Sequence, residues 1–105
     1  MAGDVFIGDD RHWAASSSMY NWVLDALIDH ATTPTAKAAL IEIRDASLGI
    51  IDLADDDYFA EGGDELLTII ATRLVPHAQR QFPQDMPARA AFLRQLNTLA
   101  DLAGA

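Results

Sequence analysis

The chain has 105 residues, of which half are hydrophobic, with no cysteine and a formal net charge of −9. This length fits a single domain with one hydrophobic core, and the absence of cysteine excludes disulfides, thiolate metal sites and a cysteine nucleophile. The N-terminus lacks the basic and apolar stretches of a secretory signal, and the longest mainly apolar run, 66–75, is too short to cross a bilayer. We therefore expect one acidic helical domain over 1–105, located in the cytoplasm.

The first predicted elements are a short extended segment and a helix. Residues 5–7 favour β structure and are expected to form a short strand or an extended arm, followed by a turn over 8–12. Apolar residues then recur at three- and four-residue intervals over 19–30, directly after the serines at 16–18, any of which can cap a helix. This pattern predicts an amphipathic helix with one buried face.

A second helix and a polar loop are predicted in the middle of the chain. The Thr-Pro pair at its start and the glycine after its end favour a helix over 34–48, with Ser47 on its inward face. Residues 50–53 are apolar and β-branched, which fits either a short strand or a continuation of helix. The composition of 55–64 predicts a loop, with Asp64 as the cap of the next helix.

Two further helices complete the predicted fold. The third runs from Asp64 towards Phe82, and Pro76 inside it should kink or break it near Val75, because proline removes a hydrogen bond and clashes with the preceding turn. The fourth covers about 85–104 and ends at a glycine. Four amphipathic helices with short connections predict a mainly all-α domain: a compact four-helix bundle or an orthogonal helical array, with or without a very short N-terminal strand.

The negative charge is unevenly distributed along the chain. Residues 1–65 hold fourteen acidic side chains against three basic ones, a net charge of −11, whereas residues 66–105 carry a net charge of +2. An acidic surface of this size repels nucleic acid and anionic lipid and attracts basic proteins. We therefore expect a basic protein partner and neither a nucleic-acid nor a membrane partner, although an acidic surface also serves solubility alone.

The sequence contains no recognisable metal-binding or catalytic motif. A calcium loop needs oxygen ligands at fixed positions and a glutamate at position 12, and starting such a loop at Asp55 or Asp57 puts apolar residues at required positions. The serines at 16–18 lack a Gly-x-Ser-x-Gly motif, and the histidines lack zinc-binding spacings. We expect no enzymatic activity, no cofactor and no metal. The alternative is a small metal-dependent enzyme or metal-binding protein that uses Asp9, Asp10, His12 and the aspartates at 55–57.

The strongest local feature is the run of three aspartates at 55–57, which Tyr58 and Phe59 follow directly. Aromatic rings beside carboxylates suit recognition of a basic protein surface, because the rings supply buried area and the carboxylates pair with lysine and arginine. The competing interpretation is a solvated loop whose aromatic side chains pack into the core.

In its size, net charge, absence of cysteine, helical pattern and Asp-Asp-Asp-Tyr-Phe loop at 55–59, the chain resembles the small acidic immunity proteins with which bacteria neutralise basic nuclease-type toxins. The resemblance implies a non-enzymatic module that binds its toxin in the cytoplasm and blocks or displaces the toxin's active site. It also implies a contact set, with two outlying steering charges at the end of the list: Asp52, Asp55, Asp56, Asp57, Tyr58, Phe59, Glu61, Asp64, Asp9 and Asp10. A homo-oligomeric structural or regulatory subunit is a further alternative, because the apolar content is high.

Overall fold

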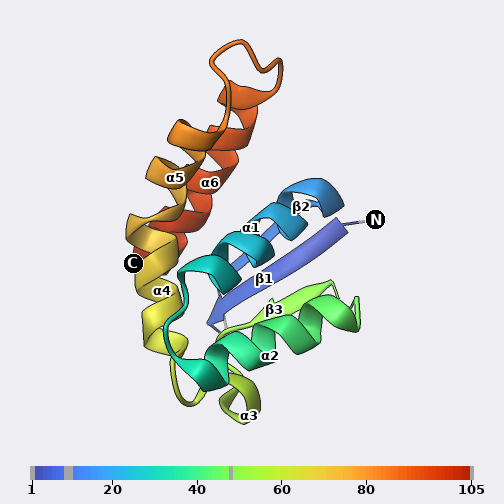
Figure 1. The fold of residues 1–105 in the computed structure, drawn as a ribbon, viewed down its shortest axis with the longest axis vertical. Helices are drawn as coiled ribbons and strands as arrows, with labels where there is room; N and C mark the ends of the chain where they lie inside the picture. Colours follow the sequence, from blue (N-terminus) through green and yellow to red (C-terminus); the bar gives the residue numbers. More distant parts are fainter. Residues whose placement is uncertain (1, 9–10, 48, 105) are drawn as a thin grey trace.

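The computed structural model describes residues 2–8, 11–47 and 49–104, and within them the chain is mainly helical with a small sheet (Figure 1). The expected helical character is confirmed, but the pure bundle or helical array is wrong, because three strands form a mixed sheet and give an α/β architecture. No helix among the described residues is both long and apolar enough to cross a membrane. The elements are β1 (Ala2–Gly8), β2 (Arg11–Ser16), α1 (Ser17–His30), α2 (Pro34–Asp45), β3 (Ile50–Asp52), α3 (Asp56–Phe59), α4 (Gly63–Thr72), α5 (Leu74–Gln81) and α6 (Arg89–Gly104).

The N-terminal residues form a β-hairpin. β1 and β2 pair antiparallel, with Val5 opposite Trp13, and both side chains are buried. Of the two alternatives expected for residues 5–7, the strand is confirmed. The turn predicted over 8–12 is too long, because β2 already begins at Arg11. Exposed and buried side chains alternate in β2 as far as Ala15, but alanine has little β propensity, so the sequence signal for this strand is weak.

β3 adds a third strand beside β1 and makes the sheet mixed. It pairs parallel with β1, so that Val5 lies opposite Ile51 and Phe6 opposite Asp52, in the strand order β2-β1-β3. Val5 and Ile51 are both completely buried. Of the two alternatives for 50–53, the strand is therefore confirmed, and it places the acidic residues that follow it at one edge of the sheet.

The first two helices start as predicted, and the second ends early. α1 begins after Ser16, whose side chain accepts a hydrogen bond from the Met19 amide (3.4 Å). α2 ends at Asp45 and not near Leu48, which lies outside the described residues. Ser47 is exposed instead of inward-facing, because the chain has left the helix there and turns with a positive φ of 54°.

The segment predicted as a loop contains the one-turn helix α3, and the long helix after it is divided in two. α4 follows Gly62, which has a left-handed φ of 91°, so Asp64 lies in the first turn and is not the cap. The predicted break near Val75 is confirmed, since α4 and α5 meet at Arg73. Pro76 falls in the first turn of α5, where its missing amide costs no helical hydrogen bond.

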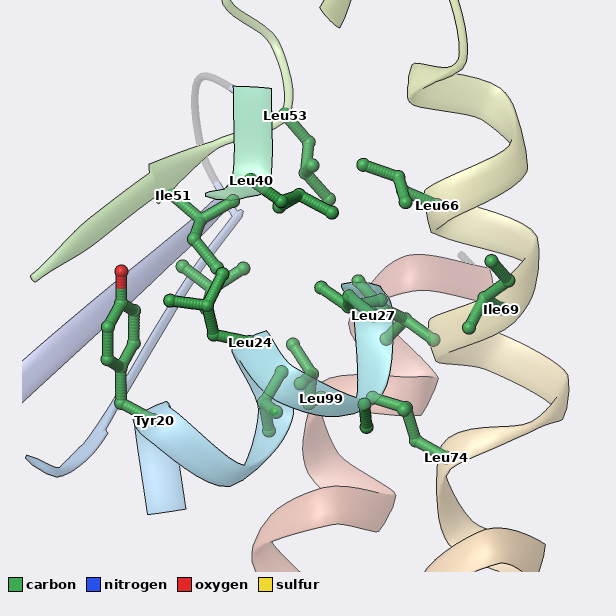
Figure 2. Packing of buried hydrophobic residues seen from close by; sticks show 14 of the residues in the cluster. Tyr20, Leu24, Leu27, Leu40, Ile51, Leu53, Leu66, Ile69, Leu74 and Leu99 are labelled. Carbon is green, nitrogen blue, oxygen red and sulfur yellow. The ribbon is translucent and has the colours of Figure 1, made fainter. Parts of the chain in front are cut away.

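One hydrophobic core joins the sheet to the helices (Figure 2). Side chains with no exposed surface come to its centre from many elements, among them Leu27, Leu40, Ile51, Leu66 and Leu99. Burying one such side chain stabilises a fold by about 1.5–3 kcal/mol relative to leaving it exposed. Among the described residues, no charged side chain is buried with them and the buried hydroxyl of Tyr20 has no hydrogen-bond partner, so the described core depends on apolar packing.

α5 and α6 form a helical pair that extends away from the sheet, and α3 lies at the opposite end of the molecule (Figure 1). Each tryptophan joins this pair to the remaining elements. Trp13 Nε1 donates to the carbonyl oxygen of Gln95 in α6 (3.0 Å), and Trp22 Nε1 donates to Oε1 of Gln81 in α5 (3.0 Å). The Trp22 ring also packs on Phe82, with ring centroids 5.3 Å apart.

Gly3 in β1 is expected to tolerate no side chain. A Cβ atom at this position would lie 2.0 Å from Cγ of the buried Tyr20 ring. We expect Gly3→Ala to lower the free energy of unfolding by about 1–3 kcal/mol through overpacking, as measured by urea denaturation. Gly8→Ala in the same strand is the control, because its Cβ would meet only the flexible side chain of Arg11, at 3.4 Å. Equal losses in the two variants would contradict the close packing of β1 on α1.

Candidate functional site

An open groove of about 230 Å³ lies between α2, β3 and α3. Its lining residues are Ile43, Ile50, Asp52, Asp55, Tyr58 and Phe59. Ile50 is 48% exposed and Tyr58 is 38% exposed, and they are the exposed large hydrophobic residues in the described part of the chain. Single apolar residues on a surface are ordinary, but the presence of both in one hollow makes this groove the candidate site.

Backbone hydrogen bonds hold the two carboxylates of the groove in place. Asp52 Oδ1 accepts from the amide of Ala54 (3.0 Å), and Asp55 Oδ1 accepts from the amide of Asp57 (2.9 Å). Asp55 is thereby the N-cap of α3. Since an ionised carboxylate offers about four lone-pair positions, each of these groups keeps acceptor capacity for a cationic partner.

The two adjacent aromatic residues of α3 have different environments. Phe59 is 4% exposed and anchors α3 on the core, whereas Tyr58 stays at the surface, with the two ring centroids 6.3 Å apart. Successive residues of a helix are rotated by about 100°, which directs neighbouring side chains to different sides. The competing interpretation, in which the aromatic side chains pack into the core, therefore holds for Phe59 and not for Tyr58.

The structure brings part of the predicted contact set into the groove. Four of its members line the groove: Asp52, Asp55, Tyr58 and Phe59. Three more are exposed and lie outside the lining: Asp57, Glu61 and Asp64. The remaining three predicted contact residues are Asp9, Asp10 and Asp56; the first two and the side chain of the third lie outside what the structure describes. Ile43 and Ile50 were not predicted as groove residues, because an isoleucine in a helix or strand is by default a core residue, whereas Ile50 is exposed in the folded chain.

Glu65, in the first turn of α4, is a structural carboxylate. It accepts hydrogen bonds from the Thr32 hydroxyl and from the backbone amides of Thr33 (3.0 Å) and Thr32 (2.9 Å). These bonds favour the charged form and lower the pKa of Glu65 to about 2. They tie the connection between α1 and α2 to the start of α4, and nothing in the sequence pattern indicates this contact.

The histidine that the metal-binding alternative relies on makes structural contacts. His12 Nε2 lies 2.8 Å from Asp4 Oδ1, and the His12 ring stacks on Phe6 with centroids 4.5 Å apart. Asp9 and Asp10, two further ligands of that alternative beside the aspartates at 55–57, lie outside the described residues. Among 2–8, 11–47 and 49–104, no group of three or more histidine, aspartate or glutamate side chains is arranged to hold a metal ion.

No protein-family model matches the chain, no curated protein matches it, and no solved structure matches it. The features of the groove that bear on what it binds are an apolar lining, two carboxylates fixed by backbone hydrogen bonds, and one exposed aromatic ring.

The low pKa of Glu65 predicts a specific pH dependence of stability. Because the pKa in the folded chain lies below the ordinary value of 4.5, the carboxylate stabilises the fold above pH 4.5, and this contribution is lost as the pH falls towards 2. Glu65→Gln should therefore have a lower free energy of unfolding than the wild type near neutral pH, with a difference that shrinks between pH 4.5 and 2 in urea denaturation. The exposed Glu61→Gln is the control, and a pH-independent difference for Glu65→Gln would contradict the assignment.

Two substitutions of Asp55 separate the effect of its charge from the effect of its helix cap. Asparagine caps helices about as well as aspartate, whereas alanine removes the cap. We expect Asp55→Ala to lower the free energy of unfolding by about 1 kcal/mol and Asp55→Asn to keep it close to the wild-type value. Urea denaturation of both variants checks this, and equal losses would show that the cap does not stabilise α3.

Proposed function

We propose that the chain is a non-enzymatic protein-binding module that uses this groove to bind and neutralise a basic partner protein. The observation that carries the proposal is the presence of exposed Ile50 and Tyr58 in the same hollow as the carboxylates of Asp52 and Asp55. In this role the chain acts in the cytoplasm as an immunity protein against a bacterial toxin, in keeping with its resemblance to that class.

The groove suits the side chain of a lysine or an arginine. The aliphatic stem of such a side chain packs on apolar surface while its charged head stays in polar surroundings. Here the stem would cover Ile43 and Tyr58, and the head would reach Asp52 or Asp55 in a charge-assisted hydrogen bond. The groove volume of about 230 Å³ is below the ~300–1,000 Å³ typical of pockets for small molecules, which favours a protein side chain over a cofactor.

The charge around the groove supports a fast encounter with a basic surface. Residues 1–65, which contribute every lining residue, carry a net charge of −11. Opposite charges raise the association rate and make it fall with ionic strength, whereas burial of Tyr58 slows dissociation. A nuclease-type toxin binds nucleic acid, a polyanion, as its substrate. An acidic protein surface carries the same sign of charge as that substrate and can occupy the same basic site.

The direct test is to express the chain with the protein encoded next to it in its own genome. If the proposal holds, this neighbour is a basic toxin, the chain protects growth, and the two proteins form a stable complex. The groove variant Asp52→Asn/Asp55→Asn should lose protection and bind with a Kd raised roughly tenfold or more, because asparagine keeps the size of each side chain and removes its charge.

The matched control neutralises two exposed carboxylates that lie outside the groove lining, Asp85 and Asp101. It changes the net charge by the same amount, so it should leave protection intact and alter the association rate only slightly. Equal effects of the two double variants, or full protection by the groove variant, would overturn the proposal.

A further inference from the structure

We infer that β3 accepts an extended segment of the partner protein as a fourth strand of the sheet. This inference rests on the proposed function of the groove and specifies how the partner is held there. β3 is an edge strand in the order β2-β1-β3, and it pairs with β1 on one side only. An added strand on its other side would run along the groove and carry lysine or arginine side chains over it.

The outer edge of β3 presents backbone groups that the fold does not use. On the inner edge, the Gly49 carbonyl and the Leu53 amide both bond to β1 at 2.9 Å. Because backbone groups alternate in direction along a strand, those of Ile50 and Asp52 point outward. The Asp52 carbonyl accepts from the Asp55 amide (3.1 Å), which leaves the Asp52 amide and both groups of Ile50 with no hydrogen bond to another described residue. These groups follow one another along the edge as amide, carbonyl and amide, which is the pattern that an extended segment pairs with.

The side chains of the same edge lead into the groove. Ile50 and Asp52 are two residues apart, so they share one face of the sheet, and both line the groove together with Tyr58. An added strand would place every second side chain on this face, over the apolar lining and close to the carboxylates of Asp52 and Asp55. Backbone pairing would then supply affinity, and the groove would select basic residues.

Charge decides between a basic partner and a second copy of this chain. Two copies paired along β3 would bring Asp52 and Asp55 of one copy towards the same carboxylates of the other, and like charges across a strand pair are destabilising. A lysine- or arginine-rich segment meets these carboxylates with opposite charge. The short strand and its aspartate therefore protect the edge against self-association and leave it open to a basic segment.

The probe is the acetylated and amidated peptide Lys-Val-Lys-Val-Lys, titrated into the full isotope-labelled chain and followed by amide chemical shifts. We expect saturable shifts at Ile50, Asp52 and Tyr58, and no binding of the matched peptide Glu-Val-Glu-Val-Glu. In an added strand only every second peptide amide faces β3. Methylating one alternate set of peptide amide nitrogens should therefore weaken binding roughly tenfold, and methylating the other set should leave it unchanged.

The outcomes separate this inference from the function on which it rests. Equal weakening by the two methylated peptides, or lysine-specific binding with no shift of the Ile50 and Asp52 amides, would overturn strand addition and leave the acidic groove as the binding site. Equal binding of the lysine and glutamate peptides would contradict the proposed function as well. No binding of the lysine peptide overturns the inference, and dimerisation in sedimentation would then identify a second copy as the occupant.

Discussion

The parallel pairing of β3 with β1 is the interaction on which the candidate site depends. It joins the N-terminal strand to the middle of the chain, with Val5 and Ile51 completely buried where they meet. The turn from Asp52 to Asp55 follows directly and sets the direction of α3, so the strand pairing also positions Tyr58. One strand thus contributes Ile51 to the core and lines the groove with Ile50 and Asp52, so the candidate site is a consequence of core packing.

The elements with strong local signals could be predicted from sequence, and those with weak or very short signals could not. α1 and α2 follow from helical spacing, a serine cap and a proline at the first helical position, and the break before Pro76 follows from the chemistry of proline. β2 contains alanine and serine, which have little intrinsic preference for strands, and it forms because β1 pairs with it. α3 is a single turn, too short for any periodic pattern to show.

The acidic segment could be located from the sequence, but which of its residues are buried and which are exposed could not. Tyr58 and Phe59 are neighbours of similar chemistry, and only the rotation of α3 decides which of them is buried. Glu61 and Glu65 likewise look alike in the sequence, yet Glu65 holds the connection between α1 and α2 while Glu61 is exposed. Folding therefore divides one acidic stretch into carboxylates that stabilise the domain and carboxylates that face the groove, which composition alone cannot do.

The placement of the tryptophans affects how binding to this chain can be observed optically. Both indole rings lie where α5 and α6 meet the remaining elements, through Gln95 and Gln81, and neither lines the groove. Tryptophan fluorescence should therefore report whether α5 and α6 are packed against the remaining elements. A ligand in the groove should leave this fluorescence largely unchanged. Tyr58 is the chromophore that such a ligand would touch, so occupancy is visible in tyrosine absorbance or through a dye attached near α3, while a flat tryptophan signal carries no information about it.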